Sequence, residues 1–155
     1  MYFDQYVSQF DIEADSAQEA LQIGADKLHE LGYVKDNFLE GLLKREEEFP
    51  TGLRLNGQCV AIPHTDSSYV NHSQIGFFQL KKPVRFQNMA NREDELDVSM
   101  IFMLAMEKPH EQIDTLCKLM ELFADEKTMH ELALCHSQES YRQIIDNSIM
   151  GGATC

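Results

Sequence analysis

The stretch Val60-Ala61-Ile62-Pro63-His64-Thr65-Asp66 joins a short apolar run to a polar loop through a single proline. Its first three residues are apolar and partly β-branched, which is typical of a buried strand. Because Pro63 has no N–H to donate to a β-ladder, strand pairing is expected to end there. His64 is therefore predicted to lie at a strand end, held by a rigid element but open to a loop, where catalytic side chains are common. From these residues alone, a polar strand terminus facing water is the simpler interpretation.

The most apolar run of the chain extends from Asp97 to Met106. Its centre is β-branched and aromatic, which favours a buried, central strand over a surface helix. Pro109 suits the first turn of the amphipathic helix that follows. The apolar positions of that helix are Ile113, Leu116, Cys117, Leu119, Met120 and Phe123. His110 is thus predicted at a helix N-terminus just beyond a buried strand.

The remaining pattern predicts helices both before and after the strands along the chain. Ser16 begins a helix over 16–31, and Asp36 is expected to cap a second helix that ends at Glu48. Other expected features are a strand or arm over 3–12, a turn at 56–57, strands over 58–62, 75–80 and 84–86, a short helical turn at 65–68, a polar connection over 88–95, helices over 128–134 and 140–145, and a frayed tail over 151–155. This order describes a single domain over 1–155, an α/β sandwich in which a mixed β-sheet is flanked by helices.

Length and charge narrow the classes of function. A chain of 155 residues can bury about 70% of its unfolded surface in one domain, so no second domain is required. The 13 basic and 26 acidic side chains give a net charge of −13, which repels phosphate backbones and anionic lipids. Nucleic acid is therefore not expected as a partner, whereas a basic protein partner would be steered to this surface.

The cysteines and the N-terminus indicate the compartment. Cys59, Cys117, Cys135 and Cys155 are scattered, without the spacing of a zinc site or a redox pair. No basic leader precedes an apolar core, and no run approaches the roughly 18 apolar residues of a membrane span. We expect a cytoplasmic protein that no segment of its own anchors or exports.

Histidine supplies the first inventory of candidate functional groups, because its charge changes near neutral pH. Four of the six, His29, His72, His130 and His136, are expected to be solvated or hydrogen-bonded structural residues. His64 and His110 differ because each follows the carboxyl end of a predicted strand, the edge at which α/β sheets form ligand crevices. If the two strands are neighbours, the imidazoles could face each other, and the helix N-terminus at His110 would suit an anion such as a phosphoryl group.

Three kinds of chemistry are compatible with this pair. Zinc could be bound by His64, His110 and Asp66, although no H-E-x-x-H spacing supports it. A Ser–His–acid hydrolase would need a nucleophile elbow, and G-x-S-x-G is absent. In a phosphocarrier, one histidine would be the nucleophile, while the other and an arginine would stabilise the phosphoryl charge.

Two motifs resemble those of a known family. Phe49-Pro50-Thr51-Gly52-Leu53 precedes the Ala61-Ile62-Pro63-His64 core, and Lys108-Pro109-His110-Glu111-Gln112 leads into an apolar helix. Together they resemble the cytoplasmic enzyme IIA domains of the fructose–mannitol superfamily of the bacterial sugar phosphotransferase system. The resemblance covers nearly the whole chain and is closest to the galactitol-type branch.

The resemblance implies a role for each site residue. His64 would accept a phosphoryl group from the phosphocarrier protein HPr and pass it to a cysteine of the cognate enzyme IIB. His110 would be the supporting histidine, and Arg45 would neutralise phosphate charge, although a surface ion pair with Glu46–Glu48 is the plainer role for that arginine. The chemistry requires no metal or organic cofactor, and contact with the membrane would be indirect, through the enzyme IIC component.

The turn before His64 differs from that of one branch of the family. The fructose-type pattern has a Gly-Asn-Gly turn close before the histidine, whereas Asn56-Gly57 stands further upstream here, with Gln58 and Cys59 between. Galactitol or another sugar alcohol is the expected substrate of the transporter served. A regulatory IIA-like protein that uses the same phosphohistidine for signalling is the alternative function. The joint presence of His64, His110 and Arg45 argues against a relative with a dead site.

Overall fold

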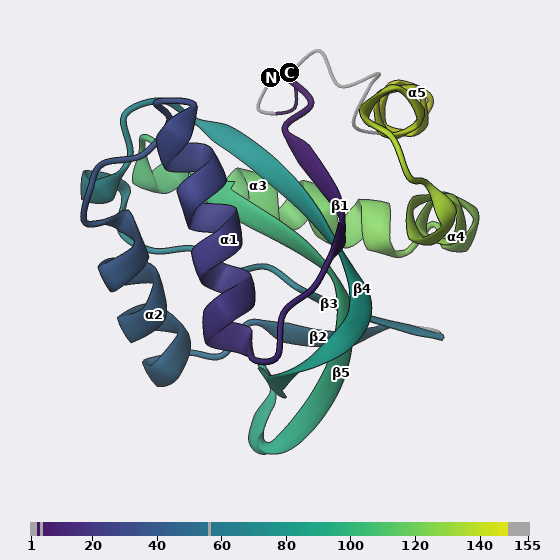
Figure 1. Cartoon of the computed structure of the whole chain (residues 1–155), viewed down its shortest axis with the longest axis horizontal. Helices are drawn as coiled ribbons and strands as arrows, with labels where there is room; N and C mark the ends of the chain where they lie inside the picture. Colours follow the sequence, from purple (N-terminus) through teal and green to yellow (C-terminus); the bar gives the residue numbers. More distant parts are fainter. Residues whose placement is uncertain (1–2, 4, 56, 149–155) are drawn as a thin grey trace.

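A mixed β-sheet lies between two layers of helices (Figure 1). The computed structural model describes residues 3, 5–55 and 57–148. Helices α1 (Ala17–Glu30) and α2 (Phe38–Glu48) cover one face of the sheet, and α3 (Pro109–Phe123), α4 (Glu126–Leu134) and α5 (Gln138–Asp146) lie on the other side. The predicted α/β sandwich is confirmed. The expected tail at 151–155 and the first residue of the expected turn at 56–57 lie outside the described residues.

The sheet combines parallel and antiparallel pairs. Its strands are β1 (Ser8–Ile12), β2 (Gly52–Leu55), β3 (Gln58–Ala61), β4 (Gln74–Asn88) and β5 (Asn91–Ala105). Strand β5 pairs antiparallel with β4 and parallel with β3, so the predicted central strand is confirmed. Beyond them, β1 runs parallel to β4 and β2 runs antiparallel to β3. The far end of β4 also reaches β2, where Gly52 pairs with Asn88.

The two faces of the sheet bury two separate sets of side chains. Successive residues of a strand point to opposite faces. Phe78 accordingly packs with Leu28 and Leu42 under α1 and α2, whereas Phe77 stacks on Tyr141 of α5 with ring centroids 4.8 Å apart. The same alternation sends Met103 to the first core and Phe102 to the second. Both faces are thus covered, which explains why the inner half of β5 is apolar from Met100 to Ala105 and why the inner half of β4 is apolar except for the buried Gln74 and Gln79.

The outer halves of β4 and β5 form a long hairpin that the sequence pattern did not predict. Lys81-Lys82-Pro83 was expected to separate two strands, and 88–95 was expected to be a connection; both expectations are wrong. Val84 and Phe86 of β4 and Leu96 and Val98 of β5 are buried, with exposed charged residues between them. Only one face of this half is buried, and the resulting polar positions resemble a loop in the sequence.

Two smaller differences precede the His64 strand. Strand β2 was not predicted. It has only four residues, and these lie between the expected end of the second helix and the expected turn at 56–57. Asn37, not Asp36, caps α2, and it makes no side-chain capping bond. The Asp36 carboxylate is instead 2.6 Å from Nε2 of His29, across the connection between the two helices.

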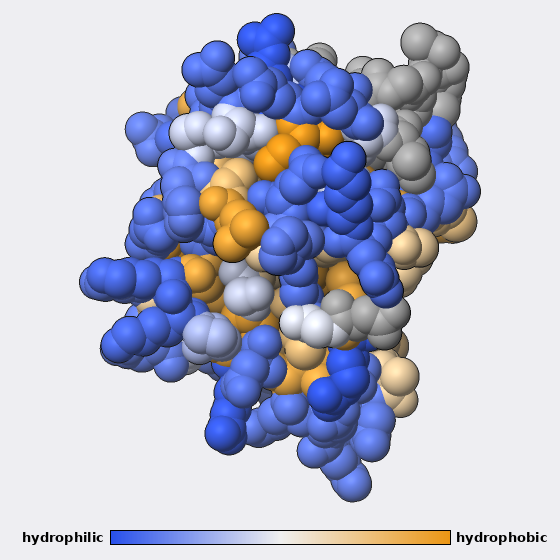
Figure 2. Space-filling model, turned by 90° about the vertical axis from the view of Figure 1, so that its right-hand side faces the viewer, coloured by the Kyte–Doolittle hydropathy of each residue, from blue (hydrophilic) through white to orange (hydrophobic). Residues whose placement is uncertain are grey.

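The surface of the molecule is largely polar at the end formed by α4 and α5. Figure 2 shows hydrophilic side chains over most of this face, with apolar atoms in small separate areas between them. Among the described residues, no helix combines the length and the apolar composition needed to cross a bilayer.

A glycine is required where β2 meets the end of β4. A Cβ atom on Gly52 would lie 2.6 Å from the backbone oxygen of Gln87. Because that oxygen belongs to the main chain of a paired strand, it cannot move without disturbing the sheet. Gly52→Ala is expected to lower the free energy of unfolding by about 1–3 kcal/mol, measured by urea denaturation. An unchanged denaturation midpoint would show that the strands can separate at no cost.

Candidate functional site

Strand β3 delivers His64 to the carboxyl edge of the sheet. Val60 and Ala61 pair in parallel register with Met100 and Ile101 of β5. Beyond Ala61 the segment that follows β3 stays beside β5, because the N–H of Leu104 donates to the carbonyl of Pro63 at 3.0 Å. His64 therefore follows the strand end, as predicted, and only 8% of its surface is exposed.

A backbone hydrogen bond fixes the tautomer of His64. Its Nδ1 lies 2.7 Å from the carbonyl oxygen of Ile62, and a carbonyl can only accept. Nδ1 must therefore carry the proton, which leaves the lone pair on Nε2 when the ring is neutral. Burial lowers the pKa of His64, and the positive charge of Arg45 lowers it further, while the bond to Ile62 opposes both. The neutral, nucleophilic form is favoured near pH 7.

His64 lies in a pocket of about 370 Å³ that also contains Arg45. The lining residues are Arg45, Glu48, Phe49, Pro50, Thr51, His64, Met89, Arg92 and Leu116. Arg45 belongs to the last turn of α2, and its guanidinium lies 4.7 Å from the centre of the Phe49 ring. A cation held over an aromatic face is partly fixed in direction. The structure thus brings together the predicted nucleophile and the predicted arginine.

Two residues of this pocket come from the unpredicted hairpin. The N–H of Met89 donates to the carbonyl of Gly52 at 2.8 Å, which holds the hairpin tip beside β2. Arg92 donates through Nη2 to the carbonyls of Glu47 and Glu48 at the end of α2, at 2.8 and 2.5 Å. Nothing in the local sequence indicated either contact, because both depend on how the hairpin folds back on the sheet.

His110 is not brought into the pocket with His64. Strands β3 and β5 are parallel neighbours, so the condition for a meeting of the two histidines is fulfilled. However, His110 is exposed on the first turn of α3 and is not among the residues that line the pocket. The same turn does contact the His64 loop, because the side-chain N–H of Gln112 donates to the carbonyl of Thr65 at 3.1 Å.

The metal-site interpretation receives no support from the geometry. Within the part of the chain that the structure describes, no group of three or more His, Cys, Asp or Glu side chains could hold a metal ion. Asp66, the expected third ligand, accepts a hydrogen bond from the N–H of Ser68 at 3.2 Å and caps the short 3₁₀ turn Ser67–Tyr69. That turn agrees with the helical turn expected at 65–68.

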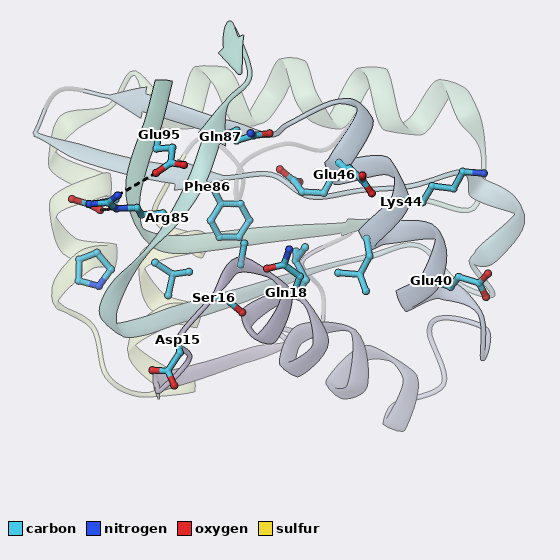
Figure 3. Close-up of a pocket in the computed structure, with 17 residues that line it drawn as sticks. Asp15, Ser16, Gln18, Glu40, Lys44, Glu46, Arg85, Phe86, Gln87 and Glu95 are labelled. Carbon is cyan, nitrogen blue, oxygen red and sulfur yellow. Dashed lines mark hydrogen bonds and ion pairs between the residues drawn. The ribbon is translucent and has the colours of Figure 1, made fainter. Parts of the chain in front are cut away.

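A second, larger groove contains no histidine. Its volume is about 1170 Å³, and it is bounded by the start of α1, by α2 and by the outer half of the β4–β5 hairpin (Figure 3). Its acidic side chains are Asp15, Glu40, Glu46, Glu47, Glu95 and Asp97. Arg85 in this groove is already paired with Glu95, at 3.2 Å. The groove is therefore the larger hollow but not the place of the candidate nucleophile.

Comparison with known proteins identifies one family of similar sequences. Residues 1–148 match the family model of the phosphoenolpyruvate-dependent sugar phosphotransferase system, EIIA 2. The galactitol-specific EIIA component of Escherichia coli K12 is 32% identical over 102 residues, 66% of this chain and 67% of that protein. The ascorbate-specific EIIA component of the same strain is 28% identical over 138 residues, 88% of this chain and 86% of that protein.

A solved complex shows the same fold. It contains mannitol enzyme IIA and phosphorylated mannitol enzyme IIB of Escherichia coli. The matched chain superimposes with a TM-score of 0.74 at 21% identity, over 96% of both chains.

The charge of Arg45 provides a test of the site's electrostatics. Because this charge lowers the pKa of His64, Arg45→Gln is expected to raise that pKa toward its ordinary value. The pKa can be measured by NMR titration of the His64 ring signals. Arg54→Gln is the control, since Arg54 lies in the β2–β3 hairpin and pairs with Asp94 at 3.0 Å. Equal shifts in the two variants would contradict a specific action of Arg45.

Proposed function

Because the chain belongs to the EIIA 2 family of the phosphoenolpyruvate-dependent sugar phosphotransferase system, we propose that it carries a phosphoryl group on His64. It is a phosphotransferase component, and the proposed donor and acceptor are HPr and a cysteine of the cognate enzyme IIB. The observation that carries the proposal is the hydrogen bond from Nδ1 of His64 to Ile62, which leaves Nε2 as the nucleophilic nitrogen.

The transfer steps follow from this tautomer. The lone pair of Nε2 attacks phosphorus, a bond from Nε2 to phosphorus forms, and the bond to the HPr leaving group breaks with its electron pair. The imidazole gains positive charge as this bond forms, and the bond from Nδ1–H to the Ile62 carbonyl stabilises that charge. In the second step a cysteine thiolate of enzyme IIB attacks phosphorus, and the electron pair returns to Nε2. Such transfers depend mainly on positioning and charge stabilisation.

Arg45 and His110 are proposed to act on the phosphoryl oxygens. Support for Arg45 comes from its place in the pocket and from its electrostatic effect on His64. Support for His110 comes from the family resemblance and from the contact between the first turn of α3 and the His64 loop. Its exposed ring would approach the site when a partner protein covers the pocket.

The proposed transporter takes galactitol or a related sugar alcohol. The galactitol-specific relative has the higher identity, whereas the ascorbate-specific relative matches more of the chain. In this proposal the protein works in the cytoplasm and meets the membrane only through the enzyme IIC component. It needs neither a metal nor an organic cofactor, because the phosphoryl group arrives already activated.

An apolar surface beside the pocket is proposed as the docking face for both partners. Phe49 is 57% exposed and Met89 is 41% exposed, and both line the pocket. On α3, Ile113 is 65% exposed and Met120 is 42% exposed, on either side of the pocket residue Leu116. HPr and enzyme IIB must reach the same imidazole, so their binding is expected to be transient and mutually exclusive.

The proposed function is tested by phosphorylation in vitro. Wild type and His64→Ala are incubated with phosphoenolpyruvate, enzyme I and HPr, and their intact masses are compared. A gain of one acid-labile phosphoryl group in wild type alone is expected. His110→Ala is expected to accept the group but to transfer it poorly to enzyme IIB, and normal onward transfer would remove His110 from the proposal. A wild type that gains no mass would leave a fold relative without the activity.

The same assay separates transport from signalling. A phosphorylated protein that donates to the galactitol enzyme IIB and restores uptake in a strain lacking its own IIA has the transport function. A phosphorylated protein that donates to no enzyme IIB would favour the regulatory alternative.

A charge on the docking face is expected to weaken association without harming the chemistry. Ile113→Lys should raise the KM for phosphorylated HPr about tenfold, with kcat little changed, because apolar contact area is lost. Leu134→Lys is the matched control, since Leu134 is 62% exposed but belongs to α4. An equal KM for Ile113→Lys and Leu134→Lys would place the docking face elsewhere.

A further inference from the structure

Glu46 joins the end of α2 to the start of β2. Its Oε1 accepts a hydrogen bond from Oγ1 of Thr51 at 2.6 Å, and its Oε2 accepts from the Thr51 N–H at 2.9 Å. Thr51 is 1% exposed, so both of its donors would be left unpaired in the interior without this carboxylate. Burial raises the pKa of Glu46, while the two bonds from Thr51 lower it. Burial is the larger effect, so the pKa of Glu46 stays above its ordinary value, and the bonds from Thr51 offset part of the cost of burying the charge.

The bond network continues from Thr51 to the nucleophile. The carbonyl of Thr51 accepts from the N–H of Ile62 at 3.2 Å, and the carbonyl of Ile62 accepts from Nδ1 of His64 at 2.7 Å. Ile62 is completely buried and lies just beyond the last residue of β3. Ile62 is thus held in place through its N–H by Thr51, and through its carbonyl it orients the imidazole of His64.

Glu46 also lies between the large groove and the His64 pocket. Glu46 lines the large groove, and Thr51 lines the His64 pocket. Figure 3 shows Glu46 on α2 at the end of the groove that approaches Gln87 of β4. Arg45 is the preceding residue of the same helical turn and faces the pocket. A movement of Glu46 would therefore displace Arg45 and the His64 support together.

We propose that Glu46 is the positioning residue of this phosphoryl-transfer site. By holding Thr51 it fixes the Ile62 carbonyl that orients the His64 ring, and it holds the last turn of α2, with Arg45, against the same strands. This inference rests on the proposed phosphocarrier function. It predicts that loss of the Glu46 carboxylate changes the chemical step and leaves partner docking intact, because the docking face lies on other side chains.

The test compares Glu46→Ala with Glu47→Ala, an identical substitution at an exposed neighbour on the same helix. Acceptance of the phosphoryl group from phosphorylated HPr is measured at varied HPr concentration. Glu46→Ala is expected to lower kcat by about tenfold or more with an unchanged KM, because misplacement of a nucleophile affects the transition state. Glu47→Ala is expected to retain both constants.

A second readout does not depend on phosphoryl transfer. The ¹⁵N signals of the His64 ring report which nitrogen carries the proton, and in wild type they are expected to show Nδ1–H alone. In Glu46→Ala they are expected to show a mixture of tautomers. A folded Glu46→Ala protein with wild-type ring signals and wild-type kcat would overturn the proposal.

A milder variant distinguishes loss of the positioning role of Glu46 from loss of folding. If Glu46→Ala does not fold, Glu46→Gln replaces it, because the amide has the same size and makes only neutral, weaker bonds to Thr51. It should shift the ring signals in the same direction by less, and unchanged signals would overturn the proposal. A wild type that HPr does not phosphorylate would instead disprove the proposed function, while the ring signals would still test the role of Glu46.

Discussion

The hydrogen bond from Nδ1 of His64 to the carbonyl of Ile62 is the interaction on which the candidate site depends. It determines which nitrogen keeps a proton, which nitrogen can attack, and which way the ring faces. Regular strand β3 ends at Ala61, but Leu104 of β5 still donates to the Pro63 carbonyl and forms an isolated parallel bridge with His64. The short segment from Ile62 through Pro63 to His64 is thereby fixed on a buried parallel pair.

The two cores explain why this turn is rigid. The side chain of Ala61 packs into the core beneath α1 and α2, and that of Ile62 packs into the core beneath α3, α4 and α5. Consecutive residues before the proline are therefore held from both faces of the sheet. Such packing restricts the backbone more strongly than either layer could alone, because interiors are close-packed. The loop that carries His64 is therefore ordered by packing on both faces of the sheet.

Local chemistry made part of this arrangement predictable from the sequence. Pro63 located the strand end and His64, and the apolar run before Met106 located the central strand. The β4–β5 hairpin was missed because its outer half alternates charged and apolar residues, and Lys81-Lys82-Pro83 resembles a break. Thr51 was noted only as part of a family motif, and Arg92 was not singled out. Their contacts join segments far apart in sequence, which periodicity cannot reveal.

The length of the β4–β5 hairpin determines which of its residues reach the pocket. Its tip bends back so that Met89 reaches Gly52 and Arg92 reaches the end of α2. Each strand residue advances the chain by about 3.3 Å and reverses the side to which a side chain points. An insertion of one residue in β4 would turn the tip away from α2, and an insertion of two would carry it past the helix end. The length of this hairpin is therefore constrained as tightly as the identity of the residues at its tip.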